Sequence, residues 1–484
     1  MGRSHIEEEL NYLSNPSYGS HFNVNTKGHL EIDGCDSVEL AKQYGTPLFV
    51  ISESTIRDNY RRFFNAVKSR YPKVLVCYGS KANHRLAIFR ILQQEGAGGD
   101  VVGPAQMHGM LRIGMDPARI VFNGNHKTEP ELIDAISAGV GAINVDSLQE
   151  LNMIDEIAAK LGKVQKIHIR IKPDYEALLS EESQWAPMRR SLFFGIDIPS
   201  GQAFEAASKA LHMKNVELRG IHNHVGWLWM IPDSKGIYDK NVALRRSKAN
   251  AVAAMDFAGK LKQELGFEAK EIDLGGGLRG TVRDEGFGYS GPSREPTIEE
   301  SIDTIVSVVK QKAKEYSFEE LPLLEFEPGG YMVSNAEALL TKVGYIKEVP
   351  TGTMPGKYVS IDVSGYIMVR KMTTSYGFYH HTIVANKAGK PPEEKVFHLK
   401  GVLCCGDVFG TDLNLPRVGM GDLIAFLDVG SYNDCMASNY NGYPLPATVL
   451  ASNGRSDITK WRETTEDVHR LDRIPSWLLG SYAR

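Results

Sequence analysis

Three features of this sequence could together bind a phosphorylated aldehyde. Lys81 follows the apolar run VLVCYG, Glu327 ends the run LPLLEFE, and the glycine triplet Gly275 to Gly277 follows IDL. A lysine amine can form an imine with an aldehyde, and a buried carboxylate can keep a pyridine nitrogen protonated. The backbone N–H groups of a glycine turn can close on a phosphate. Each feature is weak alone, because strand-end lysines are usually solvated and most glycine turns bind nothing.

The elements that must position these residues repeat along the chain. Short runs rich in β-branched residues alternate with longer amphipathic segments, a pattern typical of parallel strands joined by crossover helices. The runs begin at Val74, Gly98, Ile120, Ile143, His168, Gly220, Ile272 and Leu323. Eight such strands close a (β/α)₈ (TIM) barrel, whose active site lies at the carboxyl ends of the strands. We therefore predict an α/β fold with a barrel domain over residues 46–335.

Polar residues and glycine turns end most of these runs. The loops after strands seven and eight of a barrel are a frequent phosphate site, and here they carry the glycine triplet and EPGG, which ends in Gly329 and Gly330. We predict that pyridoxal 5′-phosphate binds there. His224 could stack on its ring or be an ordinary core histidine. Asp100 and Arg170 could orient Lys81 and Glu327, or belong to structural ion pairs.

The rest of the chain has a β-strand texture. Segments such as EALLTKVGYIKEV, KYVSIDV and HLKGVLCCGDVFG are separated by Gly, Pro and Asn turns, and KGHLEIDG near the start is similar. We predict a β-barrel or β-sandwich domain over residues 336–484, completed by an N-terminal segment of residues 1–45.

Composition and charge narrow the binding partners and the cellular location that we expect. The 55 basic and 59 acidic residues give no electrostatic reason to expect nucleic acid or an anionic membrane as partner. No run approaches the roughly 20 apolar residues of a membrane span, and the polar start MGRSHIEEEL does not resemble a secretory signal. Five cysteines, an odd number, do not suggest a disulfide framework. We therefore expect a cytoplasmic protein.

Two adjacent cysteines, Cys404 and Cys405, lie on a strand pattern, so only one of them should face a given side. A thiol near the cofactor could return a proton to a carbanion, although buried cysteine is more often inert packing. CxxC spacing is absent and His380 and His381 are adjacent, so we predict no metal site.

The ordered motifs resemble the fold-type III decarboxylases, a family that includes diaminopimelate, ornithine and D-ornithine/D-lysine decarboxylases. The resemblance covers nearly the whole chain from about residue 28 and rests on YGSKAN, HVG, DLGGGL, EPG, the cysteine segment and GSYNDCMASNYNG. It implies a barrel followed by a β domain, a pyridoxal-phosphate cofactor, and head-to-tail homodimers that share their active sites.

The resemblance also assigns roles to residues of this sequence. It places the imine on Lys81, ring stacking on His224 and the pyridine nitrogen partner on Glu327, with phosphate contacts from Gly275 to Gly277. Tyr432 would touch phosphate or substrate. Cys404 of the partner subunit would protonate Cα after CO₂ leaves, although the residues alone do not decide between it and Cys405.

Departures from the family pattern bear on the substrate. Trp227 replaces a phosphate-binding serine, Gly330 replaces the arginine that holds a distal carboxylate, and CCGD replaces a segment with a glutamate for the distal ammonium. An unpaired charge in a dry site is costly. We therefore expect a diamino acid or an N-substituted diamino acid of siderophore or secondary-metabolite assembly, rather than meso-diaminopimelate. The predicted substrate contacts are Arg370, Cys405, Asp407 and Tyr432.

Three alternatives stay open at this point. An amino-acid racemase of the same fold would need a second base facing Lys81, for which Tyr432 or Tyr440 could serve. Diaminopimelate decarboxylase of lysine biosynthesis is the second. A non-catalytic cofactor carrier is the third, and the long β domain argues against it. Release of CO₂ distinguishes a decarboxylase from the other classes.

Overall fold

The computed structural model describes residues 21–174, 193–224, 240–278, 296–369, 380–404 and 407–479. It divides into two compact units. The barrel unit lies within residues 55–335, and the β unit combines the described residues up to Ser54 with those from Ala336 onward. Arg370, Cys405 and Trp227 lie outside the described residues.

Eight parallel strands form the centre of the barrel unit. They are β5 (Val74–Gly79), β6 (Gly98–Val101), β7 (Ile120–Phe122), β8 (Ala142–Val145), β9 (Gln165–Lys172), β11 (Val216–His222), β12 (Glu271–Asp273) and β13 (Leu323–Phe326). Pairing of β13 with β5 and of β8 with β9 closes the sheet into a barrel. The predicted (β/α)₈ barrel is confirmed, with each strand at its expected run.

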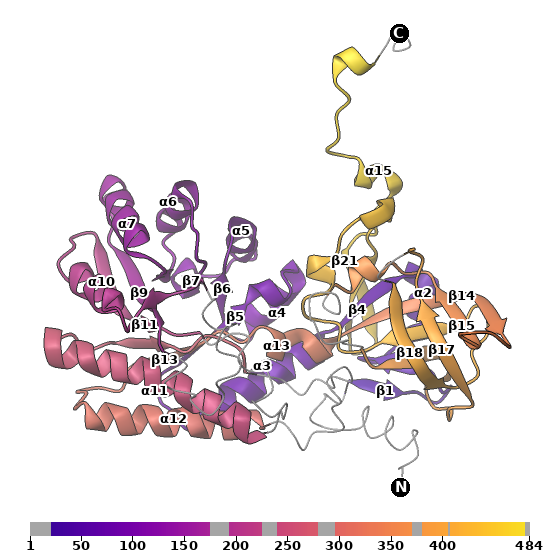
Figure 1. Ribbon diagram of the computed structural model, residues 1–484, viewed down its shortest axis with the longest axis horizontal. Coiled ribbons are helices and arrows are strands. Elements are labelled where there is room, and N and C mark those ends of the chain that lie inside the picture. Colours follow the sequence, from indigo (N-terminus) through magenta and orange to yellow (C-terminus); the bar gives the residue numbers. More distant parts are fainter. Residues whose placement is uncertain are drawn as a thin grey trace. The chain divides into compact units, whose positions relative to one another are not determined.

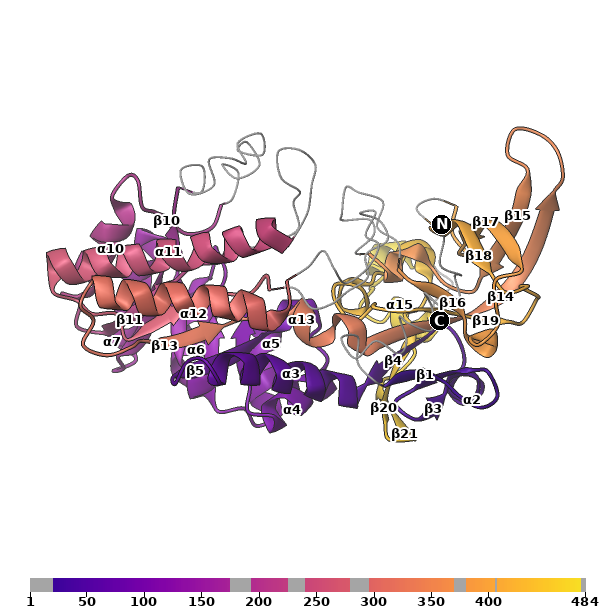
Figure 2. The same ribbon diagram turned by 90° about the horizontal axis from the view of Figure 1, so that it is seen from below.

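Helices surround these strands (Figure 1). They are α3 (Glu53–Lys68), α4 (Leu86–Gln94), α5 (Pro104–Arg112), α6 (Glu129–Ala138), α7 (Leu148–Lys160), α10 (Gln202–Ala210), α11 (Lys240–Leu265) and α12 (Ile298–Glu315). Capping boxes at Thr128 and Thr297 start α6 and α12, because each threonine and the glutamate three residues later satisfy backbone N–H groups that have no partner within the helix. The long helices α11 and α12 lie side by side in both views (Figures 1 and 2).

No helix among the described residues combines the length and the apolar character that crossing a membrane requires.

The β unit joins the two ends of the chain in one sheet. Strand β14 (Glu337–Val349) pairs with β4 (Leu48–Ser52), and β4 pairs in parallel with β20 (Ala447–Ser452). The other strands are β1 (Phe22–Val24), β2 (Leu30–Ile32), β3 (Cys35–Asp36), β15 (Gly356–Ile361), β16 (Thr382–Val384), β17 (Glu394–Lys400), β18 (Val408–Leu415), β19 (Leu423–Phe426) and β21 (Arg455–Lys460). A β-rich domain completed by the N-terminal segment is thus confirmed. Strand β4, which we had placed in the barrel domain, belongs to the β unit.

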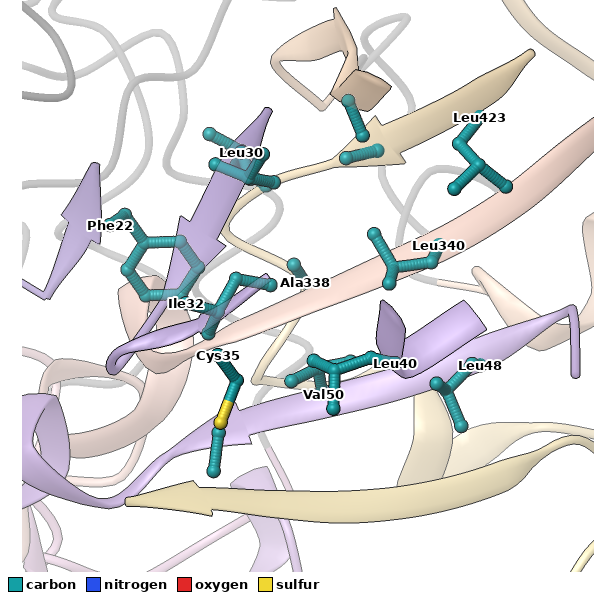
Figure 3. Close-up of a cluster of buried hydrophobic side chains, with 14 of the residues drawn as sticks. Phe22, Leu30, Ile32, Cys35, Leu40, Leu48, Val50, Ala338, Leu340 and Leu423 are labelled. Atoms are coloured by element: carbon teal, nitrogen blue, oxygen red, sulfur yellow. The ribbon is translucent and has the colours of Figure 1, made fainter. Parts of the chain in front are cut away.

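An apolar core holds the N-terminal strands to the rest of the β unit. Leu30 and Ile32 of β2 pack in one cluster with Val50 of β4 and Leu340 of β14 (Figure 3). All four side chains are essentially inaccessible to solvent. Burial of this kind contributes about 1.5–3 kcal/mol for each large aliphatic side chain, so the first described strands are integral to this unit.

Candidate active site

Alternation along the barrel strands directs polar side chains into the barrel. Residues two apart on a strand share a face, and several strands carry polar residues at that spacing near their carboxyl ends. The pairs are His168 and Arg170, His222 and His224, and Glu325 and Glu327, and Asp273 ends β12. Most of these side chains are buried, so they meet inside the barrel, where their charges must be satisfied by one another.

Lys81 lies on a short 3-10 helix, Ser80–Ala82, directly after β5. Its side chain is 37% exposed, and Nζ lies 3.5 Å from Oδ2 of the fully buried Asp100 on β6. Burial, followed by the negative charge of Glu327, raises the pKa of Asp100, while Lys81 acts in the opposite direction. The amine is therefore accessible at the carboxyl end of the barrel and forms an ion pair with Asp100. An orienting role for Asp100 stays a prediction.

Glu327 follows β13 and is almost completely buried. Its Oε1 accepts a hydrogen bond from Asn123 Nδ2 at 2.6 Å, and the same amide nitrogen donates to Asp100 Oδ1 at 2.7 Å. His222 Nε2 lies 3.3 Å from Oε2. Burial, followed by the positive charge of Arg170, lowers the pKa of His222 well below its usual value. A neutral His222 therefore donates to Glu327 through Nε2.

The glycine triplet begins one residue after β12. The N–H of Gly276 donates to His224 Nδ1 at 3.0 Å, and the N–H of Gly275 donates to Asp273 Oδ1 at 2.8 Å. Gly275 has a φ of +64°, and a Cβ on Gly276 would lie 2.4 Å from the carbonyl oxygen of Glu327. Only glycine permits this close approach of the loops after β12 and β13. Burial lowers the pKa of His224, so the ring that receives the Gly276 hydrogen bond is neutral.

The same end of the barrel thus offers what pyridoxal phosphate requires. Lys81 supplies a primary amine, Glu327 a buried carboxylate, His224 a neutral flat ring, and the triplet a backbone turn that any Cβ would fill. These groups fit the aldehyde, the ring nitrogen, the ring face and the phosphate of the cofactor. The fold and the site are those of a pyridoxal-phosphate enzyme.

Comparison with known proteins assigns the family. Residues 57–334 match the family model described as pyridoxal-dependent decarboxylase, pyridoxal binding domain, and the chain belongs to that family. It is 36% identical to diaminopimelate decarboxylase of Methanothermobacter thermautotrophicus, over 94% of this chain and 98% of that protein. It is 32% identical to the enzyme of the same name from Bacillus subtilis, over 93% and 96%. The crystal structure of diaminopimelate decarboxylase from Methanocaldococcus jannaschii superposes with a TM-score of 0.84, 35% identity, and coverage of 96% of this chain and 100% of that one.

The chain is therefore a pyridoxal-phosphate-dependent amino-acid decarboxylase, which decides against a racemase and a non-catalytic carrier. Our prediction of an N-substituted or other diamino acid in place of meso-diaminopimelate is wrong. Relatives that are 30–36% identical over nearly the whole chain are diaminopimelate decarboxylases. The error came from the weight given to a few missing charged residues, such as the arginine replaced by Gly330. A distal carboxylate can be paired by a cation from another position.

The predicted strand through the cysteines is also interrupted. Cys404 is an exposed free cysteine in the connection between β17 and β18. The N–H of Gly401 donates to the carbonyl of Asp407 at 2.9 Å, and the N–H of Val402 donates to the carbonyl of Val363 at 3.1 Å. The first bond continues the pairing of β17 with β18 one residue beyond Lys400 and Val408, and the second joins the connection to Val363, so the strand pairing ends before Cys404.

Asp407 is buried and holds this loop. Its carboxylate oxygens accept hydrogen bonds from the N–H groups of Gly365 and Leu403, each at 2.5 Å. A contact with a substrate amine stays a prediction for this residue. Tyr432, the other predicted contact in the β unit, is half-buried and has a φ of +59°. Non-glycine residues in this strained conformation are frequent at functional sites.

Three other predicted contacts have definite surroundings in the barrel unit. The Arg170 guanidinium lies over the Phe194 ring at 4.3 Å, and its Nε is 3.8 Å from Asp146 Oδ1. Gly329 closes against β5, where a Cβ would lie 2.9 Å from the Gly79 carbonyl oxygen. Gly330 begins the short helix α13, Gly330–Val333.

Several buried polar residues near the site were not among our candidates, including Asn144, His168, Asp273 and Glu325. Burial, followed by the charges of Glu327 and Glu325, raises the pKa of Asp273 well above its usual value. Burial raises the pKa of Glu325 to about 7, against the opposing effect of His168. Within the described residues, His168, Asp273 and Glu325 lie close enough to hold a metal ion, as do His222, Asp273 and Glu327. The sequence did contain a signal for such residues, because in HIR, EID and EFE polar residues two apart interrupt strands that should be apolar.

Proposed function

We propose that this chain is a diaminopimelate decarboxylase, which removes one carboxyl group of meso-diaminopimelate as CO₂ and leaves lysine after a proton takes its place. The observation that carries the proposal is similarity to enzymes of that name over more than nine-tenths of both chains. Similarity of this extent includes both the barrel unit and the β unit. The cofactor site alone would not distinguish among amino acids.

Each residue of the candidate site would have a separate role in cofactor binding or decarboxylation. When bound, pyridoxal phosphate supplies an electron-withdrawing ring that stabilises the negative charge left at Cα as CO₂ departs. Lys81 would anchor the aldehyde, Glu327 would face the ring nitrogen, and the glycine triplet would bind the phosphate. His224 would lie against the ring as an uncharged surface, which its lowered pKa favours. The thiol of Cys404 or Cys405 would return the proton to Cα, with Tyr432 in contact with phosphate or substrate.

The distal carboxylate of meso-diaminopimelate needs a cation, and we assign this role to Arg370. Gly330, at the start of α13, offers no charge. An arginine can bind a carboxylate through two parallel hydrogen bonds, which selects a substrate with a second carboxyl group over lysine or ornithine. Lys371, the next residue in the sequence, provides a basic control.

We also propose a cytoplasmic homodimer in which each subunit contributes to the other's active site. The support is the family resemblance and, for the location, the small odd number of cysteines. A thiol in the exposed loop at Cys404 would then reach the cofactor of the neighbouring subunit.

Substrate turnover tests the proposed function. The purified enzyme with added pyridoxal phosphate is assayed for CO₂ release from meso-diaminopimelate, L- and D-lysine, and L- and D-ornithine, with lysine measured as product. We expect the highest kcat/KM for meso-diaminopimelate, and no CO₂ from the Lys81→Ala variant. Arg370→Gln should raise KM for diaminopimelate about 100-fold, whereas Lys371→Gln should not. Turnover of ornithine or lysine in preference to diaminopimelate would reject the proposal.

A further inference from the structure

A line of hydrogen bonds crosses the barrel interior from Glu271 to Glu327. His168 Nε2 lies 2.9 Å from Glu271 Oε2, and His168 Nδ1 lies 2.9 Å from Asn144 Oδ1. Asn144 Nδ2 donates to Asn123 Oδ1 at 2.8 Å, and Asn123 Nδ2 donates to Glu327 Oε1 at 2.6 Å. The side chains of His168 and Glu327 are at most 2% exposed, so water does not compete strongly for these bonds.

The carboxyl groups of Asp100 and Glu327, at one end of the line, determine the direction of each hydrogen bond. One terminal atom of the Asn123 amide lies within 2.7 Å of oxygens of both Asp100 and Glu327. An amide oxygen there would require both carboxyl groups to be protonated, so this atom is the NH₂ group. Asn123 therefore accepts through Oδ1, Asn144 donates to it through Nδ2, and Asn144 Oδ1 is left as an acceptor for His168.

His168 consequently carries a proton on both ring nitrogens. Nδ1 must donate to the acceptor Asn144 Oδ1, and Nε2 must donate to the Glu271 carboxylate. Burial opposes this charge, but the hydrogen bond to Glu271 and the charge of Glu325 raise the pKa of His168. A nitrogen that holds a proton has no lone pair for a metal, so the cluster of His168, Asp273 and Glu325 is better suited to protons than to an ion.

We propose that His168 is a positioning residue for Glu327, which it orients through Asn144 and Asn123 as a buried imidazolium. From His168 Nδ1 onward the donors all point towards Glu327, so each of these three bonds polarises the next in the same direction. Asn123 fixes Oε1, which leaves Oε2 beside His222. His168 does not bond directly to Glu327, because two amides lie between them. The inference concerns the cofactor site and does not depend on which amino acid is decarboxylated.

The first test observes the protons directly and needs no substrate. Neutron diffraction from a deuterated crystal of the enzyme with bound cofactor would show deuterium on both nitrogens of His168, and the NH₂ group of Asn123 directed at Asp100 and Glu327. Deuterium on only one His168 nitrogen, or an Asn123 oxygen facing the carboxyl groups, would overturn the proposal.

The second test separates positioning from a merely structural role. We expect His168→Gln to bind the cofactor, to lower kcat about ten-fold with KM almost unchanged, and to shift the pH midpoint of the cofactor's visible absorbance. The control is His212→Gln, on an exposed residue bonded to the Ser208 carbonyl, which should match the wild type. A His168→Gln enzyme with wild-type kcat and absorbance titration would refute the role.

A double-mutant cycle tests the route. Asn123→Leu removes the donor to Glu327, so adding His168→Gln to it should cost little further activity or spectral shift. Equal effects of His168→Gln in both backgrounds would mean that His168 acts by another path. Because the spectra are recorded without substrate, failure of this inference can be told apart from an error in the proposed substrate.

Discussion

Replacement of Glu325 by glutamine should stabilise the protein in a pH-dependent manner. Glu325 is fully buried on β13, and its Oε2 has no hydrogen-bond partner among the described residues. Burial, with smaller contributions from Glu271 and Glu327, raises its pKa from 4.5 to about 7, while His168 opposes the rise. Ionising this carboxyl group is therefore harder in the folded than in the unfolded chain.

The sign and size follow from the two pKa values. Between about pH 4.5 and pH 7 the folded state holds a proton that the unfolded state has released, so the free energy of unfolding falls as pH rises. The shift from 4.5 to about 7 corresponds to about 3 kcal/mol of stability. The folded protein loses all of this stability above about pH 7 and none of it below about pH 4.5. Glutamine does not titrate. The variant should therefore gain about 3 kcal/mol over the wild type at about pH 8, and less than about 1 kcal/mol at about pH 5.

Urea unfolding, followed by tryptophan fluorescence at several pH values, measures this difference. Any fixed effect of the glutamine amide on packing is the same at each pH and cancels. Glu95→Gln is a control, because hydrogen bonds from Arg61 and Arg57 overcome burial and lower the pKa of Glu95. The stability contributed by Glu95 is lost only as pH falls below about 4.5, and its arginine partners stay charged, so this variant should differ from wild type by a constant amount from about pH 5 to pH 8. A constant difference for Glu325→Gln over that range would refute the reasoning.

Three further predictions concern the cofactor and the β unit. Lys81→Ala should abolish the visible absorbance of the bound cofactor, and an unchanged spectrum would contradict the assignment. Gly276→Ala should weaken cofactor binding about ten-fold or more in an absorbance titration, because its Cβ would lie 2.4 Å from a carbonyl oxygen; Gly103→Ala, with open space around it, should not. Asp33→Ala should destabilise the chain by about 3 kcal/mol in thermal unfolding, because four hydrogen bonds end on this buried carboxylate; a wild-type melting temperature would show that water replaces them.

The sequence was sufficient to predict the barrel because its strands have a strong local signal. Each run of β-branched residues is short, apolar and bounded by turns, and eight of them admit few other arrangements. Strand β4 was harder to assign. Its residues, LFVIS, are buried on both faces, and an apolar run of this kind does not reveal whether it joins a barrel or pairs with β14 and β20.

The site residues that could be predicted are those at the ends of strands. Lys81, Glu327 and the glycine triplet could be found because a barrel brings all its carboxyl ends together. Asn144 and His168 lie deeper in the strands, and we overlooked them because buried strands are expected to be apolar. The loop at Cys404 was missed for another reason, since it depends on hydrogen bonds to Asp407 that alternation along a strand cannot show.

The substrate could not be predicted from single positions. Gly330 and the CCGD segment suggested that two charged groups of diaminopimelate would lack partners. That argument assumes that each partner must come from one position in the sequence. Binding energy depends only on where a charge lies in space, so a guanidinium at another position can serve in place of one at residue 330, the role that we propose for Arg370.

Burial of polar side chains inside the barrel lowers the stability of the protein, and the barrel fold does not require such side chains. A barrel filled with branched apolar residues would avoid the desolvation of His168, Asp273 and Glu325, and Glu325 Oε2 has no hydrogen-bond partner in the described part of the chain. Sequences depart from such local rules mainly at functional sites. Here His168 belongs to the line of hydrogen bonds that ends at Glu327, and Glu325 lies beside this line, with its Oε2 4.0 Å from His168 Nδ1. The stability lost through Glu325 and the orientation that we propose for His168 therefore have a common origin in a polar interior arranged around Glu327.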